Sequence, residues 1–571
     1  MGNNPSWRQG EPMLTRLGPP LAMALLAGPI LLGLAGTMLP AFGYLPALGG
    51  TEFTLAPARQ LLAEPGIWMS SIISLVSGLV TTATALAIVM LFVAGWSGTR
   101  MFARIQHLIS PLLSVPHAAA AFGLAFLVAP SGMIARLVSP GLTGWQRPPD
   151  LLIVNDPMGF SMMAGLIVKE IPFLLLITLA ALPQIDAART RALTTSLGYG
   201  RIAGFLFGSW PLVYRQIRLA VFAVIAFATS VVDVAAILGP TAPAPLAVRL
   251  TQWMQDPDLS MRFFASAGAV LQLAVTAAAL LAWIGFERLG AAIRDRACSA
   301  GWRWRRDAWL RRAGLAAMLL AAAIIFAGLA TLCLWSFAGL WPFPDALPQG
   351  LSAKTWMKTA PRIGTPLATT FIAAGMSTLL AVLLSVLCLI RENETGRTGR
   401  RWALLFIYLP LIVPQVAFLF GLQLLFVLTG TIASLPALVF VHLIFVMPYV
   451  FLSLSDPWRA YDRRYEAIAA GLGKRTWTTL LRVRLPMLAR AILTAAAVGF
   501  AVSVGLYLPT VLIGAGRLDT ITTDAVALAS GGNRRVIGVY AFLQMLLPAL
   551  GFLVATLLPA LIFRHRRAMH A

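Results

Sequence analysis

Long apolar runs dominate the pattern of this chain and define the elements it predicts. A helix needs about 20 apolar residues to cross the hydrocarbon layer of a bilayer. Strands of an outer-membrane barrel would instead alternate apolar and polar positions. The pattern therefore predicts an all-α polytopic membrane protein with twelve transmembrane helices, near residues 21–43, 70–95, 108–130, 159–182, 217–240, 265–286, 313–341, 366–390, 402–428, 432–455, 490–513 and 537–563.

Two of these predictions depend on details of the sequence. The first run, from Leu21 to Leu39, is longer than the apolar region of a signal peptide, and no clear cleavage site follows it, so we expect it to remain as a span. The runs 402–428 and 432–455 are separated only by the stretch from Thr429 to Thr431, which requires a tight turn there.

Composition agrees with this class and excludes two others. Hydrophobic residues make up 59% of the 571 residues and charged residues only 11%, against about 25% charged in an ordinary soluble domain. A disordered chain would need low hydrophobicity. The three cysteines, Cys298, Cys333 and Cys388, have no paired spacing that would indicate a disulfide framework or a metal cluster.

The net charge of +23 is distributed unevenly along the chain. With both termini on the cytoplasmic side, almost all of the excess falls on cytoplasmic segments, as the positive-inside rule requires. The arginine-rich stretch within 287–312 therefore indicates a cytoplasmic linker near anionic lipid, and we expect no nucleic-acid partner.

An internal repeat divides the chain into two halves. Val115-Pro116-His117 is followed by Phe122-Gly123-Leu124, and Val413-Pro414-Gln415 is followed at the same spacing by Phe420-Gly421-Leu422. Later in each half, Ser196-Leu197-Gly198 and Gly471-Leu472-Gly473 precede Pro211 and Pro486 by the same interval. The sequence thus predicts two parallel six-span units, 1–286 and 313–571, joined by the linker 287–312.

Both long basic loops, 183–216 and 456–489, lie between the fourth and fifth span of their half. Glycine permits a positive φ between two short helices, and proline suits the first turn of a new helix. We therefore expect a short helix, a turn and a second helix in each loop.

The second loop resembles the EAA loop of permease subunits of binding-protein-dependent ABC importers. The stretch from Glu466 to Gly473, then Trp477, then Val483 to Pro486, follows that motif, with Glu466 one place early and Ile468 where alanine is usual. The first loop keeps Gly198 and Pro211 but has Ala192-Leu193-Thr194 in place of Glu-Ala-Ala. The resemblance covers nearly the whole chain, as two fused permease domains of the ferric-iron and thiamine importer type with a type I permease-like fold.

The resemblance implies partners and contact residues. The loops would dock into a cytoplasmic ABC ATPase, expected as a homodimer, and the outer side would accept substrate from a periplasmic binding protein. The implied ATPase-coupling residues are Thr195, Ser196, Leu197, Gly198, Tyr199, Glu466, Ala469, Ala470, Gly471, Leu472, Gly473 and Lys474. The resemblance also implies a transporter subunit of the bacterial inner membrane. Ile468 occupies the position of the first glycine that a Walker A loop ending in Gly473-Lys474 would need, so the chain is expected to bind no ATP itself.

Polar side chains within the spans are candidates for the translocation pathway, because charge at membrane depth is costly. Lys169 and Glu170 lie in the fourth span and Asp233 in the fifth, with His442 and Tyr507 as weaker equivalents in the second half. One arrangement pairs Lys169 with Asp233 and leaves Glu170 facing the pathway, and the alternative is a buried structural network. Acids there would suit a cation such as thiamine or ferric iron.

Two other classes fit less well. A twelve-span secondary transporter of the major facilitator type also has two parallel halves, but the loop from Gly95 to His107 contains no acid, whereas that class has an Asp-Arg pair there. An intramembrane enzyme would need catalytic groups, and the five histidines form no H-E-x-x-H motif.

Overall fold

The computed structural model describes residues 13–395 and 401–562, and every regular element in these ranges is a helix. Ten helices there are long and apolar enough to cross a membrane, and two further bent pairs raise the possible number of spans to twelve. The ten are Arg16–Ala41, Ile67–Trp96, His117–Val138, Phe160–Gln184, Arg201–Ser230, Met261–Ser299, Ala308–Phe337, Lys354–Asn393, Leu435–Ala460 and Arg534–Ile562. The predicted all-α polytopic fold is confirmed; residue 563 of the last predicted span and both chain ends lie outside the described residues.

The region 402–428 is not one straight span. Helix α16 (Arg401–Ile412) and helix α17 (Gln415–Leu428) meet at an angle of 91°. Pro414 causes this break, because it has no N–H to continue the helix and it disfavours helical backbone at Val413. The tight turn after α17 is confirmed: Gly430 has φ +67°, and α18 (Leu435–Ala460) begins five residues later.

Three other predicted spans are also interrupted. In the first half, α4 (Arg100–Ile109) and a 3₁₀ turn precede α5 (His117–Val128), with the break at Pro116. Helix α10 (Trp210–Ser230) gives way to α11 (Asp233–Leu238), and α22 (Ala489–Gly505) to α23 (Leu508–Gly514). The predictions of continuous spans at 108–130, 217–240 and 490–513 were therefore wrong in shape, because run length measures hydropathy and not backbone continuity.

The structural repeat extends to unusual backbone features. A π-helical segment, Phe205–Ser209, precedes α10, and a second, Leu480–Arg484, lies at the corresponding place in the other half. The glycines of the two loops also match, with φ +80° at Gly198 and +70° at Gly473. These paired features support a duplicated unit.

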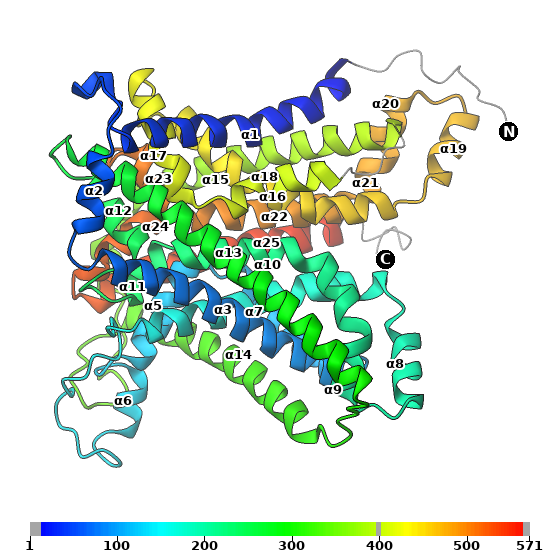
Figure 1. Ribbon diagram of the computed structural model, residues 1–571, viewed down its shortest axis with the longest axis horizontal. Coiled ribbons are helices and arrows are strands. Elements are labelled where there is room, and N and C mark those ends of the chain that lie inside the picture. Colours follow the sequence, from blue (N-terminus) through cyan, green and yellow to red (C-terminus); the bar gives the residue numbers. More distant parts are fainter. Residues whose placement is uncertain (1–12, 396–400, 563–571) are drawn as a thin grey trace.

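Each half contributes its first helix to the other half (Figure 1). Helix α1 (Met13–Ala41) packs on α17, and α14 (Ala308–Phe337) packs on α5 and α3 (Ile67–Trp96). Glycines permit both crossings: a Cβ on Gly421 would lie 1.9 Å from the Gly33 carbonyl oxygen, and one on Gly328 would lie 2.9 Å from the Gly123 carbonyl carbon. Units that follow one another in sequence are thus interleaved in space.

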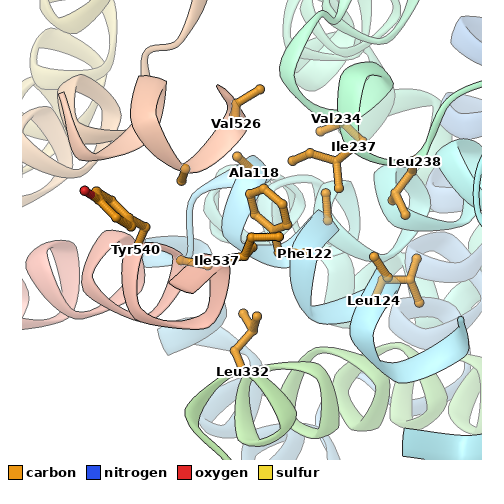
Figure 2. Close-up of a cluster of buried hydrophobic side chains, with 14 of the residues drawn as sticks. Ala118, Phe122, Leu124, Val234, Ile237, Leu238, Leu332, Val526, Ile537 and Tyr540 are labelled. Atoms are coloured by element: carbon orange, nitrogen blue, oxygen red, sulfur yellow. The ribbon is translucent and has the colours of Figure 1, made fainter. Parts of the chain in front are cut away.

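Buried apolar side chains hold the halves together toward one end of the bundle. Figure 2 shows Phe122 of α5 among side chains of α11, α14 and α25 (Arg534–Ile562). Phe122 is 2% exposed and Ile537 4% exposed. Burial of such side chains against a neighbouring helix positions α5, whose first residue is His117, between the two halves.

Candidate functional site

The first loop folds as the sequence predicts. Helix α8 (Ala187–Ser196) is capped by Asp186, whose carboxylate accepts a hydrogen bond from Arg189 N at 3.0 Å. Leu197 and Gly198 then turn the chain toward α9 (Arg201–Gly204), which continues through the π-helical segment into α10. Thr195, Ser196 and Leu197 are exposed at the end of α8, while the last two predicted contact residues, Gly198 and Tyr199, are half-buried.

The second loop has the same form. Helix α19 (Arg464–Gly471) is followed by Leu472, Gly473 and then α20 (Thr476–Thr479). Exposed residues at its tip are Ala470, Gly471, Leu472, Gly473 and Lys474. Ala469, by contrast, is only 8% exposed and packs against its own chain, so it is not available for contact with another protein as the sequence reasoning expected.

Both loops protrude from the same end of the bundle, where α8 and α19 stand apart from the long helices (Figure 1). Helices α2 (Ala56–Ala63) and α6 (Met133–Val138) lie at the opposite end. Each loop offers large apolar side chains to solvent: Leu193 and Leu197 in the first, and Ile468 and Leu472 in the second, are all at least 57% exposed. Two similar apolar tips on one face could receive two similar partner subunits.

The two loops are held to the rest of the chain by different contacts. In the second, Glu466 accepts a hydrogen bond from Arg484 at 3.0 Å, and the Arg484 guanidinium stacks 4.1 Å over the Trp458 ring. Arg191 and Ser209 occupy the corresponding positions of the first loop, so no such ion pair can form there. Sequence reasoning noted the missing acid of the first loop but did not identify Arg484 as the partner of Glu466.

Lys169 does not pair with Asp233, contrary to the arrangement considered from the sequence. Its ammonium donates to the backbone carbonyl oxygens of Leu112 and Leu113, at 3.4 and 3.2 Å. These carbonyls lie just before the break at Pro116. Proline has no N–H, so it cannot donate a helical hydrogen bond to the Leu112 carbonyl. Lys169 therefore makes a structural contact with the end of the 3₁₀ turn Ser110–Ser114.

Glu170 instead binds His117. The Glu170 carboxylate lies 3.1 Å from Nε2 of His117, whose ring lies 4.7 Å from that of Phe227. Glu170 also interacts electrostatically with Tyr449 of α18, in the second half. Tyr449 follows Pro448 as Phe173 follows Pro172, and this repeat of the proline was the signal that could have identified it.

Asp233 is the first residue of α11, at the break in the fifth span. It interacts electrostatically with His117 and with Tyr507, which precedes α23 at the matching break of the other half. The structure thus brings Glu170, Asp233 and Tyr507 together with His117 between the halves. Glu170 and Asp233 are at most 8% exposed, so both carboxylates are buried between the halves.

His442 contacts side chains other than those of this cluster. Its Nδ1 lies 2.7 Å from the Ser503 hydroxyl and its Nε2 3.0 Å from that of Thr510, all within the second half. Because both ring nitrogens have partners, His442 belongs to a local polar network between α18, α22 and α23.

Long apolar helices, a duplicated unit, an acidic cluster between the halves and two matched loops at one end together define a polytopic transport protein. No protein-family model matches the chain. It is 30% identical to the inner membrane ABC transporter permease protein YnjC of Escherichia coli over 529 residues, which cover 90% of this chain and 94% of that protein. The chain therefore belongs to the family of ABC transporter permeases, and it is a multi-pass protein of the inner membrane.

Shorter similarities fall in the same family. The molybdenum transport system permease protein ModB of Mycobacterium tuberculosis is 32% identical over 160 residues, 26% of this chain and 60% of that protein. The putative 2-aminoethylphosphonate transport system permease protein PhnV of Salmonella typhimurium is 23% identical over 227 residues, 39% of this chain and 84% of that protein. The chain is thus a permease component of an importer, and the expectation of the family from the second loop is confirmed.

Proposed function

We propose that this chain forms the translocation pathway of an ABC importer and that both loops couple it to ATP hydrolysis by a separate cytoplasmic ATPase homodimer. A periplasmic binding protein would deliver substrate at the opposite end, and both termini would be cytoplasmic. The observation that carries the proposal is the pair of matched helix-glycine-helix loops with exposed apolar tips at one end of the bundle.

We propose a cationic substrate, such as thiamine or ferric iron. Two buried carboxylates, those of Glu170 and Asp233, support a cationic substrate. Lys169 donates to backbone carbonyls and so does not neutralise the charge of Asp233. The ligand that copurifies with a periplasmic binding protein that stimulates uptake by this chain tests the proposal: a cation supports it, and an oxyanion such as molybdate contradicts it.

The coupling role is tested with Gly473→Asp. This substitution places a carboxylate at the exposed tip of the second loop, where a docked ATPase would bury it without a partner. Because φ is +70° at Gly473, the matched control is Gly473→Asn, a side chain that tolerates left-handed backbone without adding charge.

We expect the aspartate variant to insert normally and to lose uptake, and the asparagine variant to retain most of it. Wild-type uptake by the aspartate variant, with the ATPase bound, would contradict the assignment.

A further inference from the structure

The linker between the two halves lies against the first loop. Residues 303–307, here called the strap, contact the turn that follows α8. Gly200 N donates to the Arg303 carbonyl at 2.9 Å, and Arg305 Nε donates to the Gly198 carbonyl at 3.2 Å. The Arg303 guanidinium also stacks 4.5 Å over the Tyr199 ring.

Asp307 makes the central contact of the strap. Its carboxylate oxygen Oδ2 accepts a hydrogen bond from Ile202 N at 2.7 Å, at the start of the helix that runs from Arg201 to Ser230. That helix begins after Gly200, which has no side chain to cap it. Asp307, only 7% exposed, thus supplies from another part of the chain the capping acceptor that a helix start requires.

The sequence of the turn suits this close approach. A Cβ on Gly200 would lie 2.0 Å from the Trp304 carbonyl oxygen, so only glycine fits beneath the strap. Trp304 itself has φ +39°, a conformation that costs free energy for a residue other than glycine and that persists where surrounding contacts hold it. The corresponding position of the second loop is Arg475, which is exposed among the described residues.

Asp307 is also the residue that immediately precedes α14, the first long helix of the second half. One side chain therefore joins the start of α14 to the start of the helix that leads into the fifth span of the first half. The first loop lacks the ion pair that Glu466 and Arg484 form in the second, and the strap holds it instead at Gly198, Gly200 and Ile202.

We propose that the strap is a part of the first coupling element, with Asp307 as its positioning residue. It fixes the first loop to α14, so that displacement of α8 by a docked ATPase moves α14 with it and acts on both halves at once. This role rests on the proposed function of the loops. In this role the linker transmits movement between the halves, in addition to connecting them in sequence.

Distances between spin labels test this role in the intact complex of permease and ATPase, with its three native cysteines replaced. One label is placed at Ser196, at the exposed end of α8, and the other at Arg312, exposed on α14. Distances are compared without nucleotide and with ATP and vanadate. We expect one narrow distance in both states, because the strap carries the two sites together.

Substitutions in the strap make the test specific. Asp307→Ala should lower the ratio of the native to the altered distance population by about fivefold, the factor expected in an equilibrium constant for loss of one helix cap. Asp307→Asn keeps an acceptor oxygen and should retain that population. Gly200→Ala should separate the strap from the loop without altering the strap itself, and Arg306→Ala is the matched control, since that side chain has no partner among the described residues.

Two results would overturn the proposal. One is a native distance that changes with ATP in the unsubstituted complex, and the other is an unchanged distance distribution in both Asp307→Ala and Gly200→Ala. Failure of the proposed function is recognised separately, by an ATPase that does not bind the permease or by wild-type uptake after Gly473→Asp with the ATPase bound. If Gly473→Asp blocks uptake but the distance between the two labels in the unsubstituted complex changes with ATP, the proposal for the strap is wrong and the proposed function stands.

Discussion

Lys169 and Glu170 are neighbours in sequence but face different surroundings. Lys169 donates to backbone carbonyls just before the break at Pro116, whereas Glu170 pairs with His117 close to Asp233 and to residues of the second half. Charged side chains at this depth can form a buried structural network or line the translocation pathway. The contacts of Lys169 are structural. Glu170 and Asp233 are the groups we assign to the pathway.

This assignment predicts unequal effects of neutral substitutions. Glu170→Gln or Asp233→Asn should reduce uptake of the substrate carried by the associated binding protein by roughly tenfold or more, since each removes a charge whose hydrogen bonds are worth about 1.5–3 kcal/mol. Tyr507→Phe removes no charge and should have a smaller effect. Wild-type uptake in both acid variants would favour a purely structural role.

Asp524, on α24 (Ile521–Ala527), gives a pH-dependent prediction outside the spans. Burial and the neighbouring Asp519 raise the pKa of Asp524 to about 6. Folding therefore favours the protonated form, and the contribution to stability is present below the pKa of the unfolded chain and is lost as the pH rises through 6.

Asp524→Asn should accordingly raise the Tm of the detergent-solubilised protein at pH 7.5 and change it little at pH 4. Thermal unfolding followed at both pH values checks this prediction. An equal change in Tm at the two pH values would show that the carboxyl charge is not the cause.

At the scale of elements, the features that could be predicted from the sequence are those that depend on local residue chemistry. Gly198 and Gly473 mark turns because their positive φ is a local requirement, so both loops were predicted as helix-turn-helix units from sequence alone. The bend at Pro414 was missed because it lies inside a continuous apolar run. The contacts of Asp307 and Arg484 could not be predicted, because each depends on how distant segments pack.

The crossing of α1 and α17 predicts a strong effect of a single added side chain. Gly421→Val would place atoms where Gly33 now approaches, and overpacking of this kind costs about 1–3 kcal/mol. We expect lower Tm and lower yield of folded protein.

Gly364→Val on α15 (Lys354–Thr395) is the matched control, because no atom lies within 4 Å of the position of its Cβ. Equal stability of the two variants would contradict the close crossing of α1 and α17.

At the scale of the whole molecule, the exchange of first helices makes the halves interdependent. The sequence predicts two consecutive units, and loops and π-helical segments recur in the same order along the chain. The exchange of α1 and α14 was not predictable, because hydropathy identifies spans but not their neighbours. The ranges 1–286, 287–312 and 313–571 remain predictions from sequence.

The central claim is that two loops at one end of the bundle receive the ATPase. Photoreactive residues at Leu197 and Leu472, tested in the assembled complex, examine it most directly, with Leu142, 86% exposed near α6, as the control. The account predicts cross-links to the ATPase from both loop positions and none from Leu142. Absence of a cross-link from both loops, in a complex that hydrolyses ATP, would contradict it.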